Sequence, residues 1–367
     1  MKKTNRVLYI LVSVLLIPFI AYAQENGDQK HAEYKFTTKG LVRNVYENDS
    51  LVKSINVLKP ILIFKSKYEV DTENGDSRFA IRNARVGIQG NLSRIFSYKF
   101  MVDLSADGKF QVLDLYAGIK VSNRVEFKVG QGGIPLFNSY TISPNSIDYV
   151  NRPFVGKYFN SSRDIGVTAS FKLKKNGFPI ALDAGIYNGD GINNPKWTTS
   201  FAYGGRILFG GMKGWRTTAK FYRTKNDDLN NYFIWGADLR YEADSYKIEA
   251  EYMNKYNNSH DSSVEPYKSL SAMYIQGLYK IALNSVAVKR LEPCLRWDGM
   301  GYDIFNKGLG CNRATAGLNL VFNTNAFLTL VRLNYEHYFN NSKDMSKVFT
   351  TDYHNDSKLS LEVLLVF

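Results

Sequence analysis

The chain has 367 residues, of which 44% are hydrophobic, 22% are charged and 14% are aromatic. That length allows one large domain or two ordinary ones, and the composition excludes a disordered chain. A mean hydropathy of −0.28 excludes a membrane protein built from many apolar helices. Because the chain has only two cysteines and four histidines, we predict no metal site and no other cofactor.

The N-terminus has the pattern of a signal peptide. Lys2, Lys3 and Arg6 precede an apolar stretch at 7–20, and the sequence Ala-Tyr-Ala at 21–23 offers a cleavage site. The apolar stretch is shorter than the ~20 residues that an anchor helix needs. We therefore predict export, which leaves 44 basic and 34 acidic residues and lowers the net charge from +13 to +10. An exported chain without apolar helices can span a membrane only as a closed barrel.

Apolar and polar residues alternate in many short segments of the remaining chain. Near the C-terminus, Leu359, Leu361 and Val363 share one face of an expected strand. Ser360 and Glu362 share the other face. Such alternation, repeated between turns, is typical of strands in a membrane barrel. Sixteen strands are predicted, at 55–68, 78–91, 95–105, 110–121, 124–131, 163–173, 179–187, 201–209, 215–223, 233–242, 244–254, 267–279, 287–298, 312–322, 327–338 and 358–367.

The connections between these strands alternate between short and long. Short turns such as 92–94 and 122–123 contrast with long loops at 132–162, 188–200, 255–266, 299–311 and 339–357. Bacterial barrels have short periplasmic turns and longer outer loops, whereas a soluble sandwich would not predict this alternation. We therefore predict an all-β fold, a transmembrane antiparallel β-barrel of sixteen strands over residues 55–367. Residues 24–54 are either a periplasmic segment or the start of the barrel.

Several motifs around the loop 132–162 resemble those of a known family. In chain order they are Phe79–Gly90 (FAIRNARVGIQG), Gly130-Gln131, Ile134–Phe137 (IPLF), Arg152, Ser162–Val167 (SRDIGV), Ala184–Gly189 (AGIYNG) and Gly205-Arg206. Their order and spacing resemble the phosphate-selective porin O and P family. The sequence departs from the family pattern at Asn83, which replaces one arginine of a pair, and at Gly132-Gly133, which replace a charged and a bulky residue.

The resemblance implies an outer-membrane porin, a homotrimer in contact with outer-membrane lipid. By analogy with sixteen-stranded porins, the loop 132–162 between the fifth and sixth strands should fold inward and constrict the pore. The expected function is passive diffusion of small hydrophilic solutes, anionic or neutral, with a mild preference for anions and phosphate as a candidate. The alternative is a barrel whose long loops act as a surface adhesin or receptor.

Other function classes lack support in the sequence. The basic residues are spread along strands and turns, so we predict no nucleic-acid partner. No Ser–His–acid constellation can be assembled around the four histidines, so we predict that the protein is not an enzyme.

Charged residues at inward positions of the strands and in the loop 132–162 are candidate pore residues, because rings of arginine and lysine favour anions. They are Arg152, Lys157, Arg163 and Asp164 in and beside the loop, and Arg85, Lys99, Lys128, Lys172, Arg206, Lys220, Arg240 and Arg332 on the strands. For each charge, simple solvation of the lumen wall is the alternative. For Arg163 and Asp164, the alternatives are a local ion pair or a loop anchor.

The two cysteines flank the predicted loop 299–311, and both have inward parity. A hairpin symmetric about 302–303 would place Cys294 and Cys311 nearly opposite each other, where a disulfide could form in the oxidising periplasm. Two unrelated thiols are the alternative, because a disulfide requires Cα atoms about 4.4–6.8 Å apart.

Overall fold

The structure is a computed structural model, described here over the greater part of the chain. The described residues are 30–37, 40–47, 50–106, 109–136, 144–156, 159–175, 178–225, 231–258, 268–323, 328–339 and 356–366. The predicted signal peptide, 1–23, and the candidate pore residue Lys157 lie outside these ranges.

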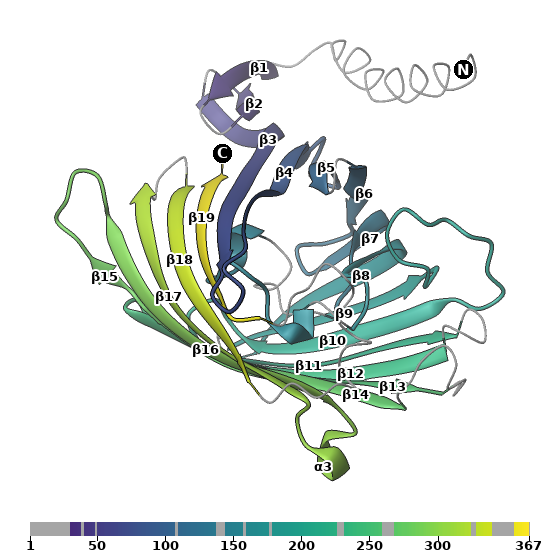
Figure 1. The fold of residues 1–367 in the computed structure, drawn as a ribbon. Coiled ribbons are helices and arrows are strands. Elements are labelled where there is room, and N and C mark those ends of the chain that lie inside the picture. The colour runs from purple at the N-terminus through teal and green to yellow at the C-terminus, as the bar shows by residue number, and fades with distance from the viewer. Residues whose placement is uncertain are drawn as a thin grey trace, which may run out of the picture.

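The described strands form a closed antiparallel barrel (Figure 1). In chain order they are β3 (Ser50–Asp71), β4 (Ser77–Asn91), β5 (Phe96–Ala106), β6 (Lys109–Lys120), β7 (Val125–Gly133), β8 (Arg163–Lys175), β9 (Phe178–Tyr187), β10 (Ala202–Gly210), β11 (Gly214–Lys225), β12 (Asn231–Glu242), β13 (Tyr246–Asn257), β14 (Ser269–Tyr279), β15 (Ile281–Ala282), β16 (Arg290–Tyr302), β17 (Cys311–Asn323), β18 (Leu328–Phe339) and β19 (Lys358–Val366). The short β15 follows β14 along the same edge of β16, so the two count as one barrel strand.

The last strand closes the barrel on the first. β19 pairs antiparallel with β3, from Lys358 opposite Asp71 to Val366 opposite Ile63. Counted in this way, the described part of the chain contains a sixteen-stranded barrel, and each of the sixteen predicted segments overlaps one of its strands. The predicted all-β fold, a closed antiparallel barrel of sixteen strands, is confirmed.

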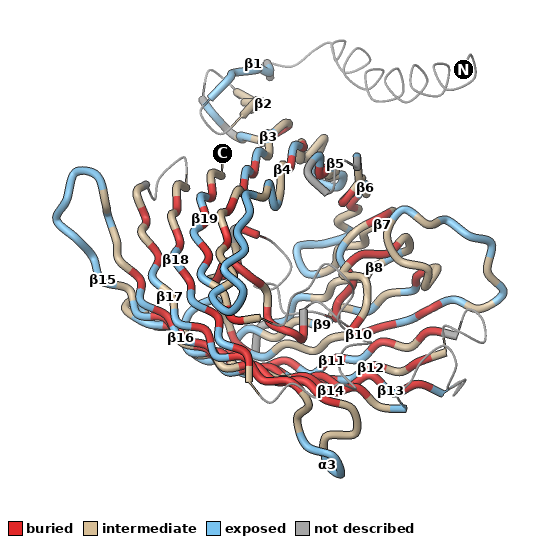
Figure 2. The backbone as a smooth tube through the Cα atoms, in the orientation of Figure 1, coloured by how far each residue is buried: buried red, intermediate tan, exposed pale blue. Residues whose placement is uncertain are grey.

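The alternating pattern places polar side chains inside and apolar side chains outside. On β18, Arg332, Asn334 and Glu336 are buried, whereas Leu333 and Tyr335 are exposed. The same alternation of buried and exposed residues follows most barrel strands (Figure 2). A barrel whose exposed face is apolar and whose interior is charged is suited to lipid outside and to polar solutes inside.

Three connections depart from the expected alternation of lengths. β5 ends at Ala106 and β6 begins at Lys109, only residues 72–76 connect β3 to β4, and only residues 226–230 connect β11 to β12. All three connections lie at the barrel end that carries the long loops. The rule of long outer loops therefore holds for most connections from β7 onward and not at the start of the barrel.

Residues before the barrel form a small sheet at its end. β1 (Lys30–Thr37) and β2 (Gly40–Glu47) form a hairpin, and β2 pairs with the first part of β3. The hairpin lies at the barrel end where the C-terminus lies (Figure 1). Gly40 at the turn has φ +112°, and a Cβ there would approach the Leu58 carbonyl oxygen to 2.0 Å, so this close turn requires glycine.

Helices are few and short among the described residues. Two 3₁₀ turns, η1 (Pro144–Ser146) and η2 (Phe154–Gly156), lie between β7 and β8, and α3 (Ile304–Lys307) lies between β16 and β17. None of the helices in the described ranges has the length and apolar character needed to cross a membrane.

Of the two alternatives for the cysteines, the structure contradicts the disulfide and agrees with two unrelated thiols. In the β16–β17 hairpin, Cys294 lies opposite Gly317 and Cys311 lies opposite Met300. Met300 is six positions from Cys294 along β16, a distance of about 20 Å at the usual rise per strand residue. The hairpin is centred beyond 302–303 because β16 continues to Tyr302 and α3 follows it. Both cysteines are free and buried.

We expect both thiols to resist modification in the folded barrel. Cys294 is 4% exposed and Cys311 is 0% exposed. Buried thiols of this kind react slowly because a reagent cannot reach the sulfur. A maleimide reagent should label neither thiol in the folded protein and both after denaturation, with the same electrophoretic mobility with and without reductant. A mobility shift on reduction of monomeric protein would contradict the observed register.

Candidate functional site

The connection between β7 and β8 is tied to strands far from it in the barrel. Backbone carbonyl groups of residues 147–152 accept hydrogen bonds from inward-facing side chains of β3, β16, β17 and β18. The donors and acceptors are Arg332 to Ile147 (2.7 Å), Asn319 to Asp148 (2.9 Å), Lys65 to Val150 (2.8 Å), Arg296 to Asn151 (3.0 Å) and Arg313 to Arg152 (2.8 Å). We call residues 147–152 the tethered segment.

One aromatic side chain fixes the middle of the tethered segment. Tyr149 is 1% exposed, and its hydroxyl lies 3.1 Å from the Gly277 carbonyl oxygen and also contacts that of Leu295. The Arg296 guanidinium lies 4.5 Å from the centre of the Tyr149 ring, in a cation–π contact. Tyr149 thus anchors the segment on β14 and β16.

The wall beneath the tethered segment is a network of paired charges. Arg313 donates to both carboxylate oxygens of Asp298, at 3.0 and 2.7 Å, and to Glu336 at 3.1 Å. Arg332 and Lys65 both pair with Glu362, at 2.7 and 2.6 Å. These side chains are at most 2% exposed. Charges that are buried, paired and hydrogen-bonded hold structure together.

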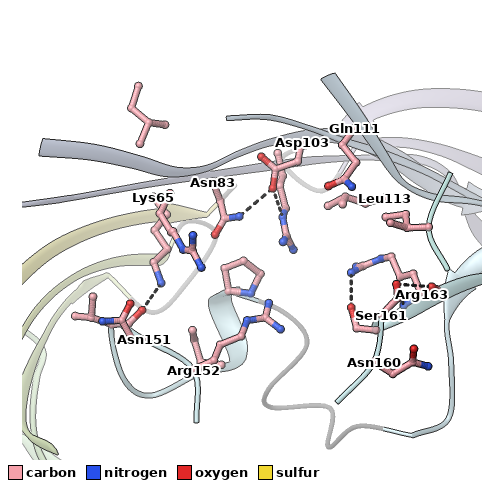
Figure 3. Close-up of a pocket in the computed structure, with 18 residues that line it drawn as sticks. Lys65, Asn83, Asp103, Gln111, Leu113, Asn151, Arg152, Asn160, Ser161 and Arg163 are labelled. Atoms are coloured by element: carbon pink, nitrogen blue, oxygen red, sulfur yellow. Dashed lines mark hydrogen bonds and ion pairs between the residues drawn. The ribbon is translucent and has the colours of Figure 1, made fainter. Parts of the chain in front are cut away.

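A cavity of 390 Å³ lies between the tethered segment and the wall formed by β3 to β6 (Figure 3). Its charged lining is basic in excess: Lys65, Arg82, Arg85, Arg152 and Arg163 stand against Asp103. Asparagine, glutamine and serine side chains fill much of the rest of the lining. The lining can therefore bind a small anion through guanidinium and amide donors.

Some of these basic groups are partly neutralised. Asp103 accepts hydrogen bonds from Arg85 at 3.0 Å and from Asn83 at 2.9 Å. Asp114, just outside the cavity, pairs with Arg163 at 2.7 Å and with Lys99 at 2.7 Å. Glu362 likewise pairs with Lys65, at 2.6 Å. Three acidic groups thus stand against the five basic residues of the lining, so basic groups remain in excess around the cavity.

Arg152 comes from the tethered segment and faces other cations across the cavity. Burial lowers its pKa to about 9, together with repulsion from the like charges of Arg85, Arg163 and Arg82. The group remains protonated at neutral pH and adds its charge to those of the three arginines near it at the cavity. Such a cluster is stabilised by an anion, because an anion relieves the repulsion.

A β-bulge brings Arg82 to the cavity. Lys65 pairs with Asn83 and Ser66 pairs with Ile81, so Arg82 is the extra residue between two registers. Strict alternation from Arg85 places residue 82 on the outer face, and for that reason Arg82 was absent from the predicted pore residues. The motif at 79–90 contains Arg82 and was the available signal. Lys65 was missed as well, because inward parity was not applied to the first predicted strand, 55–68.

The predicted pore residues divide into a group at the cavity and a group elsewhere. Arg85, Arg152 and Arg163 line the cavity, and Lys99 lies beside it through Asp114. The others are placed as follows: Lys128 over the Tyr116 ring at 5.5 Å, Lys172 exposed on β8, Arg206 paired with Asp183 at 2.5 Å, Lys220 paired with Asp238 at 3.0 Å, Arg240 bonded to the carbonyls of Gly211 and Met212, and Arg332 in the network described above.

Arg163 and Asp164 do not form the local ion pair that was one alternative for them. Arg163 pairs with Asp114 instead. Asp164 is 2% exposed and accepts hydrogen bonds from the backbone N–H groups of Ile165 and Gly189, at 2.7 and 2.9 Å. Asp164 is therefore a loop anchor, as the other alternative stated.

The closed barrel, its apolar exterior and its charged interior define an outer-membrane porin. Solved porins share this fold at low sequence identity. OmpF of Salmonella typhi, in complex with daunomycin, matches with a TM-score of 0.64 and 15% identity over 91% of this chain and 100% of that chain. An anion-selective porin from Comamonas acidovorans matches with a TM-score of 0.57 and 11% identity over 84% and 99%. The outer-membrane channel DcaP of Acinetobacter baumannii matches with a TM-score of 0.55 and 14% identity over 84% and 97%.

The sequence identifies the family within that class. The model of the family described as "Phosphate-selective porin O and P" matches residues 64–245. The chain belongs to this family, as its motifs indicated, and is a non-enzymatic channel of the outer membrane. No match is found among curated proteins.

Proposed function

We propose that this porin passes small hydrophilic solutes with a preference for anions, phosphate among them, and that the basic cavity is the narrow part of the pathway. The observation that carries the proposal is the lining of that cavity, where five basic side chains stand against one acidic side chain. The family description and the anion selectivity named for the Comamonas porin agree with this charge.

The connection between β7 and β8 is the constriction loop of the proposal. It leaves the wall at β7 and reaches carbonyl-binding side chains on β16, β17 and β18, so its path crosses the barrel lumen. With the loop across the lumen, solutes pass on the side of Arg82, Arg85 and Arg152. Low-dielectric walls strengthen the field of these charges and raise the local anion concentration.

Assembly and orientation follow the family in this proposal. The barrel end that carries the termini and the shorter turns is periplasmic, as in bacterial barrels generally. The sheet of β1, β2 and the start of β3 then extends into the periplasm, after a signal peptide at 1–23. The porin is a homotrimer, with outer-membrane lipid and small anionic or neutral solutes as its partners.

Channel recordings of the purified full chain in a planar bilayer test the proposal. Across a potassium chloride gradient we expect a reversal potential of the sign that marks anion preference. Phosphate added at constant ionic strength should reduce the chloride current, because the two anions compete for the same arginines. Open channels without preference would overturn the anion proposal. Sealed barrels would favour the adhesin or receptor alternative.

A further inference from the structure

Three motifs that are separate in the sequence meet at the outer ends of β7, β8 and β9. Gln131 lies on β7, Asp164 lies on β8, and the sequence Tyr-Asn-Gly-Asp-Gly at 187–191 ends β9 and begins the next connection. Hydrogen bonds between them hold residues 188–194, which we call the second loop. One residue of the second loop, Ile192, lines the basic cavity.

Asp164 holds the start of the second loop. Its carboxylate accepts the backbone N–H of Gly189 at 2.9 Å, and the Tyr222 hydroxyl donates to the same oxygen at 3.2 Å. Gly189 and Gly191 have φ values of +88° and +79°, which only glycine adopts without strain. A Cβ at Gly191 would lie 3.2 Å from the Cβ of Ser161, a residue of the cavity lining. The second loop therefore lies directly against the cavity.

Gln131 holds the end of the second loop through both atoms of its amide. Its oxygen accepts the Asn193 backbone N–H at 2.8 Å, and its nitrogen donates to the Asn193 side-chain oxygen at 3.0 Å. The same nitrogen donates to the Val112 carbonyl at 2.7 Å. Gln131 is 6% exposed, so its amide loses these partners without replacement by water if the loop moves. The loop is thus fixed on either side of Ile192.

We infer that the second loop is a fixed wall of the solute pathway, in which Ile192 sets the size limit and Gln131 and Asp164 are its positioning residues. The inference rests on the proposed function, because it requires solutes to pass through the cavity. The arginines select solutes by charge. The aliphatic side chain of Ile192 carries no charge and limits the width of the pathway. The two contributions are separable in one experiment.

Single-channel recordings of the full chain measure conductance, reversal potential and exclusion of neutral polymers of graded size. We expect Ile192→Ala and Gln131→Met each to raise conductance about 1.5-fold and to admit larger polymers, with the reversal potential unchanged. Gln276→Met is the matched control, because Gln276 is a buried, inward-facing glutamine on β14 that does not line the cavity. Its conductance should equal that of the wild type. The electrophoretic shift between folded and heated barrels verifies folding of each variant.

Modification of an introduced thiol gives a second readout, the channel current, which would not change if Ile192 had a purely structural role. Wild-type channels should ignore an anionic methanethiosulfonate reagent, since Cys294 and Cys311 are buried. Ile192→Cys channels should lose about half of their current in a single step when the reagent is added, because the added group lies in the pathway. Unchanged current in Ile192→Cys and unchanged conductance in Ile192→Ala would overturn the inference while leaving the porin function intact. Wild-type protein without channels would overturn the proposed function itself.

Discussion

Replacing Tyr149 with alanine is expected to increase single-channel conductance severalfold and to weaken selectivity. The substitution removes a side chain that is 1% exposed, with its contacts to the backbone of Gly277 and Leu295 and to the Arg296 guanidinium. Loss of a buried aromatic side chain costs about 3–5 kcal/mol. The cost falls on the tethered segment and not on the barrel, whose strands keep their own backbone pairing. The segment should therefore leave the wall part of the time and open the lumen.

Two further variants make the Tyr149 result specific. Tyr149→Phe keeps the ring over Arg296 and loses the hydroxyl contacts, worth about 1 kcal/mol, so a smaller increase in conductance is expected. Tyr335→Ala removes a tyrosine of the lipid-facing side of β18, 42% exposed, and should leave conductance unchanged. Recordings in planar bilayers, with heat-induced unfolding followed by electrophoresis, give both readouts. Wild-type conductance in Tyr149→Ala would show that the tethered segment does not narrow the lumen.

The barrel was predictable from sequence because the same local alternation, weak in one strand, is repeated in sixteen of them. A strand such as β18 alternates charged and apolar residues, and lipid on one side with solutes on the other imposes that alternation on the whole wall. The closing pair of β19 with β3 needs no sequence signal of its own, since an even number of antiparallel strands closes without a free edge. The alternation within each strand and the closure of the barrel therefore predict the same fold.

The site was only partly predictable because its geometry depends on long-range contacts. Parity correctly indicated that Arg332 points inward, yet its contact with the Ile147 carbonyl joins residues far apart in the chain and turns it from a pore residue into an anchor. The bulge at Arg82 interrupts the alternation of inward and outward residues, and no local sequence pattern predicts the bulge. The position of Cys311 depends on where the hairpin turns, which α3 shifts. Inward parity thus distinguishes lumen from lipid and does not distinguish solute contacts from structural pairs.

Reversing the charge of Arg152 is expected to have the largest effect on selectivity. Arg152 lines the cavity and faces Arg82, Arg85 and Arg163, so glutamate there places an acid among three cations and changes the local charge by two units. Two unit charges 4 Å apart interact by about 1 kcal/mol in water and about 4 kcal/mol near a protein surface. Since 1.4 kcal/mol corresponds to tenfold, the ratio of anion to cation permeability should fall by at least about tenfold.

The reversal potential of Arg152→Glu across a potassium chloride gradient measures this ratio. Arg152→Lys keeps the charge and should keep the sign of the potential, with weaker block by phosphate, because an ammonium lacks the planar fork that binds two anion oxygens. Lys307→Glu makes the same change of charge on exposed α3, where no cavity residue lies, and should leave selectivity as in the wild type. If Arg152→Glu and Lys307→Glu shift the potential equally, selectivity comes from the overall charge of the barrel and not from the basic cavity. An unchanged anion preference in Arg152→Glu alone would place the narrow part of the pathway away from the tethered segment.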